Sequence, residues 1–182
     1  MKTSREDLLA VAFRLFVSKG VAGTSMMDLA RESGLSKGAF HHYFPRKDDL
    51  LDACLERYFA AGVPTDLDHD GTSRGFARAA ADRYAGLLAA LVAQGISLVA
   101  YQAFLWSMLR DGRIDAGEMA SAARAELTAL LANEGHSVPE VGATALLAAI
   151  EGAGALACQR PAPSAEELRG FFDAALSPDV NG

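Results

Sequence analysis

The sequence predicts an all-helical protein, and three observations support this prediction. Residues branched at the β carbon are sparse, alanine and leucine dominate, and apolar residues recur at spacings of three and four. Of the 182 residues, 51% are hydrophobic and 22% are charged. This composition is typical of globular proteins and excludes a disordered or fibrous chain. The length allows one compact body with a packed core but is short for an ordinary two-domain enzyme.

The first helix is expected at about residues 4–19. A capping box that begins at Thr3 or at Ser4 marks its start, and Gly20 follows its last turn. Its inward face carries apolar residues at helical spacing. These residues are Leu9, Ala12, Phe13 and Phe16.

Two short helices separated by a tight turn follow. Thr24 and Ser25 cap the first of them, which closes at Gly34. Ser36 caps the second, which ends at Phe44. This arrangement predicts a helix-turn-helix, a motif whose second helix enters the major groove of DNA.

Six further helices are expected, which brings the total to about nine. Pro45 cannot continue the preceding helix, so a fourth helix opens after Lys47 with two acidic residues in its first turn. Residues 63–72 are expected to form a loop, because proline, glycine and aspartate gather there. The later helices are expected at about 73–93, 96–110, 115–134, 139–159 and 164–176.

Charge is distributed unevenly along the chain. The first 47 residues carry eight Lys and Arg against four acids, a net charge of +4, whereas the remaining residues carry nine basic and 19 acidic groups, a net charge of −10. A polyanion would therefore be attracted to one end of the chain and repelled by the other. The alternative is a chance skew on a solvated surface.

One stretch of the chain could be taken for a membrane span. The uncharged segment from Tyr84 to Leu109 is long enough to cross a bilayer. Gln94 and Gly95 interrupt it, and this break favours two buried helices of a soluble protein. The N-terminus lacks the apolar core of a signal peptide. We therefore expect a cytoplasmic protein without a membrane partner, and a membrane-associated helical protein is the alternative.

No catalytic residue, metal ligand or cofactor is expected. Cys54 and Cys158 lie far apart and follow no metal spacing, which predicts neither a disulfide framework nor a zinc site and fits a reducing compartment. His69 and His136 stand alone, so solvent-facing or loop residues are expected there rather than metal ligands. The absence of a nucleophile elbow, a phosphate loop and paired catalytic carboxylates at a recognisable spacing argues against an enzyme.

The outward residues of the second short helix suit contact with DNA. Lys37 can donate to the acceptor atoms of guanine, and Gly38 lets the backbone approach a base pair or a phosphate closely. His41, His42 and Tyr43 can donate to phosphates or base edges. For His42, a partly buried capping or packing role is the alternative.

The helix starts supply further DNA-binding candidates. Thr24 and Ser25 stand at a helix N-terminus, where hydroxyls and free backbone N–H groups form a phosphate site. Ser36 occupies the same position on the second short helix, and Lys47 offers another phosphate clamp. Thr24 would cap its helix whether or not DNA binds.

The run from Thr24 to Leu50 closely resembles the DNA-binding domain of the TetR (tetracycline-repressor) family of bacterial transcriptional regulators. Many positions match in register across three helices, and the detailed resemblance covers roughly residues 5–55. The resemblance implies a helix-turn-helix DNA-binding domain at residues 1–47. Residues 48–182 would then form a helical bundle that binds an effector and dimerises.

The resemblance also implies a function. Members of such a family act as ligand-responsive regulators, so we expect a repressor that binds a palindromic operator as a dimer and leaves it when a small molecule binds. A transcriptional activator, or a regulator of the same fold that senses no ligand, is the alternative. The sequence identifies neither the operator nor the effector.

Two residues depart from the family pattern. Met27 stands in the first turn of the first short helix, where the family often has a basic or polar residue. It can touch a thymine methyl or a sugar but donates no strong hydrogen bond. His41 stands where the family commonly has a tyrosine in the recognition helix, which leaves its target open between phosphate and base.

The C-terminal part carries candidate surfaces for a partner and a ligand. The helix expected at 139–159 is rich in glycine and alanine, which let another helix approach closely, so a homodimer through about residues 139–176 is expected. Intramolecular packing alone is the alternative. Tyr101, Gln102 and Trp106 are the candidate ligand-binding residues, because aromatic walls with a few polar groups suit a small-molecule cavity. Core packing is the alternative for each of them.

Overall fold

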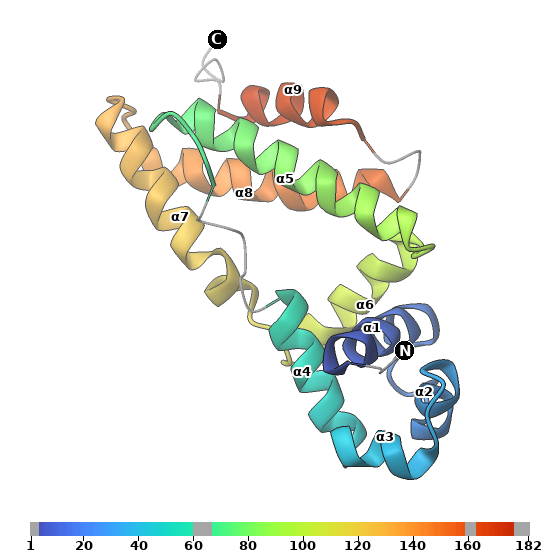
Figure 1. The fold of residues 1–182 in the computed structure, drawn as a ribbon. Coiled ribbons are helices and arrows are strands. Elements are labelled where there is room, and N and C mark those ends of the chain that lie inside the picture. Colours follow the sequence, from blue (N-terminus) through green and yellow to red (C-terminus); the bar gives the residue numbers. More distant parts are fainter. Residues whose placement is uncertain (1–3, 60–66, 159–162, 177–182) are drawn as a thin grey trace. The chain divides into compact units, whose positions relative to one another are not determined.

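The computed structural model describes residues 4–59, 67–158 and 163–176, and every regular element in these ranges is an α-helix (Figure 1). The helices are α1 (Arg5–Lys19), α2 (Met26–Glu32), α3 (Lys37–Tyr43), α4 (Lys47–Phe59), α5 (Ser73–Ala93), α6 (Leu98–Arg110), α7 (Ala116–Asn133), α8 (Pro139–Ala157) and α9 (Ala165–Ala175). The predicted all-α class is confirmed, and the helices follow the predicted order. Thr3 and residues 63–66 of the predicted loop lie outside the described residues.

The helices form two compact units. The first contains α1–α4 together with Val99–Ile114, which includes nearly all of α6, and the second contains α5, α7, α8 and α9. The chain therefore differs from the single body that its length suggests. The structural division also differs from the functional division expected between residues 47 and 48, because α4 and α6 pack with the N-terminal helices.

Local sequence explains where several helices begin. Capping boxes start α1 at Ser4, α2 at Ser25 and α9 at Ser164, and in each the serine hydroxyl accepts a backbone N–H while an acidic side chain accepts the N–H of the serine. These hydrogen bonds from Ser4 lower the pKa of Asp7 below its ordinary value. Of the two boxes that the sequence allows for α1, the structure contains the one at Ser4.

The break between α5 and α6 follows from Gly95. Its φ is 71°, in the left-handed region that favours glycine, and its N–H donates to the carbonyl of Val92 at 2.9 Å. Ile96 then donates to the carbonyl of Leu91 at 2.9 Å and buries its side chain. The uncharged stretch from Tyr84 to Leu109 is therefore two helices, as predicted.

Aromatic rings hold the core of the first unit. Phe13 of α1 stacks on Tyr58 of α4 with ring centroids 4.2 Å apart, and it meets Phe104 of α6 edge-on at 6.1 Å. Phe59 of α4 stacks on Tyr101 of α6 at 6.2 Å. Pairs of this kind add about 0.5–1.5 kcal/mol each beyond the area they bury. They attach α6 to α1 and α4.

The second unit is a bundle in which α5 packs against α9, α7 against α8, and α8 against α9 (Figure 1). Phe76, Leu127, Leu146 and Phe172 are fully buried in its core. By length and composition alone, α8 could cross a membrane. Leu146 of α8 is fully buried in this core, and 28% of the apolar stretch of α8 is buried in all.

The loop histidine His69 of the second unit is held by two hydrogen bonds. Its Nδ1 accepts the N–H of Gly71 at 3.1 Å, and its Nε2 lies 3.1 Å from a carboxylate oxygen of Glu126. Since Nδ1 accepts, Nε2 carries the proton and donates. The ring also meets Phe76 edge-on at 5.6 Å. His69 is thus a bonded, largely buried loop residue.

Because aromatic rings attach α6 to the first unit, removing one buried ring should destabilise this unit strongly. Replacing Phe104, which is 4% exposed, by alanine should lower the free energy of unfolding of the first unit by about 3–5 kcal/mol. Trp106→Ala on the same helix is the matched control, because Trp106 is 60% exposed, and its effect should stay within about 0.5 kcal/mol. Urea denaturation followed by circular dichroism measures both. Equal effects would show that α6 is not part of this core.

Candidate nucleic-acid interface

The helix-turn-helix expected from the sequence is present in α2 and α3. The turn passes through Gly34, whose φ is 69°, and the N–H of Leu35 donates to the carbonyl of Ala30 at 3.0 Å. Ser36 then caps α3, because its hydroxyl accepts the N–H of Ala39 at 3.2 Å. The turn and the cap together determine where α3 begins.

Burial of one face of α3 leaves the opposite face exposed. Phe40 is 0% exposed and Phe44 is 3% exposed, and Leu29 of α2 is buried as well. The exposed residues on or at the ends of α3 are Ser36, Lys37, Gly38, Ala39, His42 and Tyr43. The structure therefore brings most of the predicted DNA-binding residues together on one surface.

The space beside Gly38 is not filled by any neighbouring side chain of the described residues, so it is open to another molecule. A Cβ built at this position would meet no atom within 4 Å. A glycine inside a helix costs up to about 1 kcal/mol relative to alanine. Since no packing in the described structure offsets this cost, the open space supports the interpretation that another molecule approaches the backbone here.

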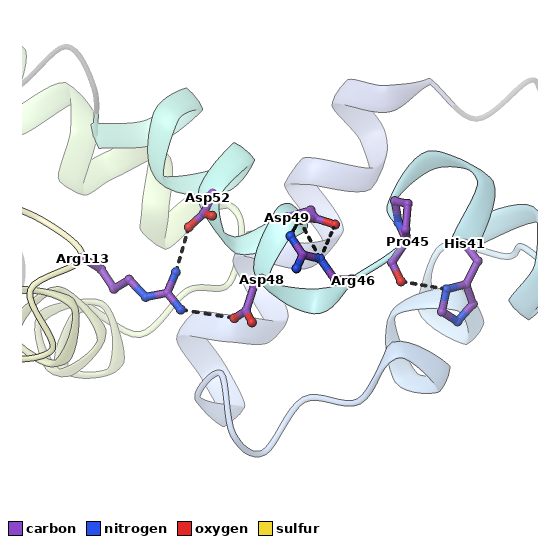
Figure 2. A network of polar contacts seen from close by, with 7 residues as sticks. All are labelled: His41, Pro45, Arg46, Asp48, Asp49, Asp52 and Arg113. Carbon is purple, nitrogen blue, oxygen red and sulfur yellow. Dashed lines mark hydrogen bonds and ion pairs between the residues drawn. The ribbon is translucent and has the colours of Figure 1, made fainter.

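His41 is half-buried and is bonded beyond its own helix. Its Nδ1 lies 3.1 Å from the carbonyl oxygen of Pro45, which precedes α4 (Figure 2). A carbonyl oxygen only accepts hydrogen bonds, so Nδ1 carries a proton and donates. The next two residues, His42 and Tyr43, are exposed, and their rings meet edge-on at 6.2 Å.

Thr24 differs from its sequence-based prediction. Its side chain is 1% exposed, and its hydroxyl donates to the carbonyls of Gly20 at 2.8 Å and Leu15 at 3.3 Å. The N-cap of α2 is Ser25 alone, whose hydroxyl accepts the N–H of Asp28 at 3.1 Å. Thr24 therefore closes the turn after α1 and is not the helix cap, and its hydroxyl is already occupied inside the protein.

Lys47 joins α4 to the segment that precedes α2. Its ammonium donates to the carbonyls of Val21 at 2.8 Å and Thr24 at 3.1 Å. An ammonium group has three N–H donors, so one donor is left for a phosphate. Lys37, in contrast, makes no hydrogen bond or ion pair within the part of the chain that the structure describes.

Most arginines of the first unit are paired with carboxylates. Arg46 lies 2.6 Å from Asp49 (Figure 2), and Arg31 lies 2.7 Å from Asp28. The Arg46 side chain, by hydrogen bonding, lowers the pKa of Asp49 below its ordinary value. Exposed pairs of this kind contribute little to stability, because solvent screens them. Exchanging such a carboxylate partner for a DNA phosphate therefore costs little.

Arg113, in the segment after α6, bridges two acids of α4. Its Nη1 lies 2.9 Å from Asp52 and its Nη2 lies 3.2 Å from Asp48 (Figure 2). One guanidinium thus spans the start of the helix that follows α3. Sequence reasoning missed Arg113, because its partners lie 61 and 65 residues away and no local pattern marks the contact.

Of the three candidate ligand-binding residues, Tyr101 lies on a different face of α6 from Gln102 and Trp106. Tyr101 is 9% exposed, and burial raises its pKa to about 12. Gln102 is half-buried and Trp106 is 60% exposed. Adjacent residues of a helix point about 100° apart, so the packing of Tyr101 against Phe59 turns Gln102 away from the aromatic core.

An apolar groove of about 230 Å³ lies between α8 and α9. Its walls are Ala153, Leu156, Ala157, Pro163, Glu167, Leu168 and Phe171. Leu156 is 41% exposed and Phe171 is 40% exposed. A Cβ at Gly152 of α8 would meet no atom within 4 Å. This surface therefore combines exposed apolar side chains with room for close approach, which is typical of an interface.

Comparison with known proteins places the similarity in the first unit. Residues 8–54 match the family model described as "Bacterial regulatory proteins, tetR family". The chain is 41% identical over 59 residues to the uncharacterized HTH-type transcriptional regulator YuxN of Bacillus subtilis, a match that covers 32% of this chain and 20% of YuxN. It is 38% identical over 58 residues to the HTH-type transcriptional repressor NemR of Escherichia coli K12, covering 32% of this chain and 29% of NemR. These matches span less than a third of each relative.

Solved structures resemble nearly the whole chain. A transcriptional regulator from Rhodococcus sp. Rha1 matches with a TM-score of 0.67 and 24% identity over 96% of this chain and 94% of that one. NalD of Pseudomonas aeruginosa, described as the secondary repressor of the MexAB-OprM multidrug efflux pump, matches with a TM-score of 0.60 and 23% identity over 94% and 95%. At these identities the likeness establishes the fold, including the helices outside residues 8–54.

Proposed function

We propose that this member of the tetR family of bacterial regulatory proteins, identified by its residues 8–54, is a repressor. It binds a palindromic operator as a homodimer and leaves the operator when a small-molecule effector binds. The observation that carries the proposal is the exposed outer face of α3, with Lys37 and Gly38 above the buried Phe40. Selection of genomic fragments by the purified full chain tests it. An enriched palindrome is expected, and the lack of any preferred sequence would contradict the proposal.

The sign of regulation is open to a separate measurement. Transcription from a reporter that carries the selected operator should fall when the chain is present and recover with the effector. A rise would instead assign an activator, and no response to any effector would assign a ligand-independent regulator. We infer that the protein works in the cytoplasm, where DNA is accessible and thiols such as Cys54 stay reduced.

We assign the DNA contacts to two groups of residues. Lys37, Gly38, His41, His42 and Tyr43 of α3 are assigned to the major groove, where base edges and the flanking phosphates are within reach. Ser25, Ser36 and Lys47 are assigned to phosphates, which position the protein without reading sequence. Thr24 is left out because its hydroxyl is occupied by main-chain carbonyls.

Lys37 and Lys47 should then affect DNA binding in different ways. Lys37→Ala is expected to weaken binding to the selected operator by about 1–3 kcal/mol and to change binding to random duplex little, because it removes a base contact. Lys47→Ala should weaken binding to both and reduce the slope of log K against log salt by about one. Fluorescence anisotropy at several salt concentrations measures these quantities, after circular dichroism has shown that both variants are folded. If each variant lost the same affinity on the operator as on random duplex, the division into base and phosphate contacts would be wrong.

A homodimer through α8 and α9 is proposed from the surface of these helices. The outward small residues of α8 recur at spacings of three and four. They are Val141, Ala145, Ala148, Gly152 and Ala155. Small side chains let two helices pack at 8–10 Å between axes, and the exposed Leu156 and Phe171 add apolar area. Two copies are also what a palindrome requires, since each half-site takes one α3 at a spacing of about 34 Å.

A charge in this surface should separate the two copies. Leu156→Glu is expected to raise the dissociation constant of the dimer by at least about 100-fold, because twofold symmetry would bury an unpaired charge on both sides. Leu87→Glu on α5 is the matched control, since Leu87 and Leu156 are both 41% exposed, and it should remain dimeric. Sedimentation velocity measures the oligomeric state. A monomeric wild-type protein, or a dimer indifferent to Leu156→Glu, would contradict this interface.

Effector release is proposed to act through α6. Gln102 and Trp106 lie on a face that the aromatic core of the first unit does not use, and we assign them to ligand binding. The same helix is attached to α1 and α4 by Phe104 and Tyr101, and Arg113 just beyond it holds α4. A displacement of α6 would therefore be passed to α4 and α3. Useful coupling requires about 1–3 kcal/mol of differential ligand affinity.

Removal of both side chains should abolish the ligand response. In the double variant Gln102→Ala and Trp106→Ala, the operator complex should no longer dissociate in a small-molecule extract of the source cells that dissociates the wild-type complex. Unchanged circular dichroism and operator affinity are the required controls. A wild-type response in the folded double variant would show that the effector binds elsewhere.

A further inference from the structure

The hydrogen bond of His41 determines the chemistry of its second ring nitrogen. Nδ1 donates to the carbonyl of Pro45 at 3.1 Å (Figure 2). In a neutral imidazole only one nitrogen carries a proton, so Nε2 keeps its lone pair and accepts. Figure 2 shows this second nitrogen turned away from Pro45. The neutral side chain therefore offers an acceptor to whatever approaches α3.

His41 stands one helical turn after Lys37. They are four positions apart in the sequence, so they lie about 6 Å apart along the helix axis, on neighbouring positions of the same face. Gly38 lies between them and brings no side chain that would cover either group. The ammonium of Lys37 is a donor only. This face of α3 thus presents one donor group and one acceptor nitrogen within the span of about two base pairs.

The major groove offers few partners for an acceptor. Hydrogen-bond donors occur there only on the exocyclic amino groups of cytosine and adenine, whereas guanine and thymine present acceptor oxygens and nitrogens. Phosphate oxygens are also acceptors. Against a guanine, a thymine or a phosphate, the lone pair of Nε2 would be left without a partner, which is unfavourable. The tautomer therefore favours contact with a base that carries an amino group, which is cytosine or adenine.

We propose that His41 is a specificity-determining residue whose Nε2 accepts a hydrogen bond from the amino group of a cytosine or an adenine in each half of the operator. The proposal rests on the proposed function, because it requires α3 to lie in the major groove. Lys37 then selects guanine, and His41 selects an amino-bearing base close to it. The Pro45 carbonyl sets this preference from outside the helix.

The test uses the full chain and the selected operator. Each cytosine and adenine of a half-site is replaced in turn by an analogue that lacks the amino group, 2-pyrimidinone for cytosine and unsubstituted purine for adenine. At one position the wild-type protein should lose affinity by about 5- to 100-fold. His41→Phe, which keeps an aromatic ring without nitrogens, should lose nothing further there. His41→Gln, which keeps an acceptor oxygen, should retain the preference. His42→Phe, whatever its overall affinity, should show the same loss at that position as the wild-type protein, because it leaves Nε2 of His41 in place.

The outcomes separate this inference from the proposed function. The analogues also weaken base pairing, but this effect is common to all variants and cancels in the comparison between them. Equal losses for wild type and His41→Phe at every position would overturn the inference while leaving an operator-binding regulator. A uniform loss of His41→Phe affinity on operator and random duplex would also overturn it, because that is the result of a phosphate contact. If His41→Phe is unfolded, loss of the preference in folded His41→Gln counts against the inference. Failure to select any operator would overturn both.

Discussion

Burial of Phe40 and Phe44 is the constraint on which the candidate interface depends. A helix of seven residues is not stable alone in water, because the cost of nucleation exceeds what so few hydrogen bonds return. α3 therefore exists because its inner face packs into the first unit, where Phe40 is 0% exposed. The same packing decides which residues face outward, so the position of Lys37 and Gly38 on the surface follows from the burial of the two rings.

The attachment of α6 to this unit combines two kinds of interaction. Stacked and edge-on rings of Phe59, Tyr101 and Phe104 supply apolar area, and Arg113 adds a charged bridge to two acids of α4. The aromatic contacts provide most of the stability, since exposed ion pairs are worth little. Arg113 instead adds a specific contact between α4 and the segment after α6. In this way α6, which lies outside the helix-turn-helix, is attached to α4, the helix that follows α3.

Two histidines of the chain show how neighbours determine side-chain chemistry. At His69, Nδ1 accepts the N–H of Gly71, so the proton is on Nε2. At His41, Nδ1 donates to the carbonyl of Pro45, so in the neutral ring the proton is on Nδ1 and Nε2 is unprotonated. Both residues are histidines, yet Nε2 of His69 is a donor to Glu126 and Nε2 of neutral His41 is an acceptor. The difference arises from a backbone group two or four residues away.

The sequence by itself determined the all-helical class, the order of the helices and the helix-turn-helix, because apolar periodicity, serine caps and glycine stops act within a few residues. It also placed Lys37 and Gly38 outside and Phe40 inside. Only the tertiary structure decided that Ser25 and not Thr24 caps α2, that Lys47 bonds main-chain carbonyls, and that Arg113 reaches α4. The hydroxyl of Thr24 is taken by carbonyls four and nine residues before it, whereas the contacts of Lys47 and Arg113 join groups 23 to 65 residues apart. No short-range pattern in the chain encodes which distant groups will meet.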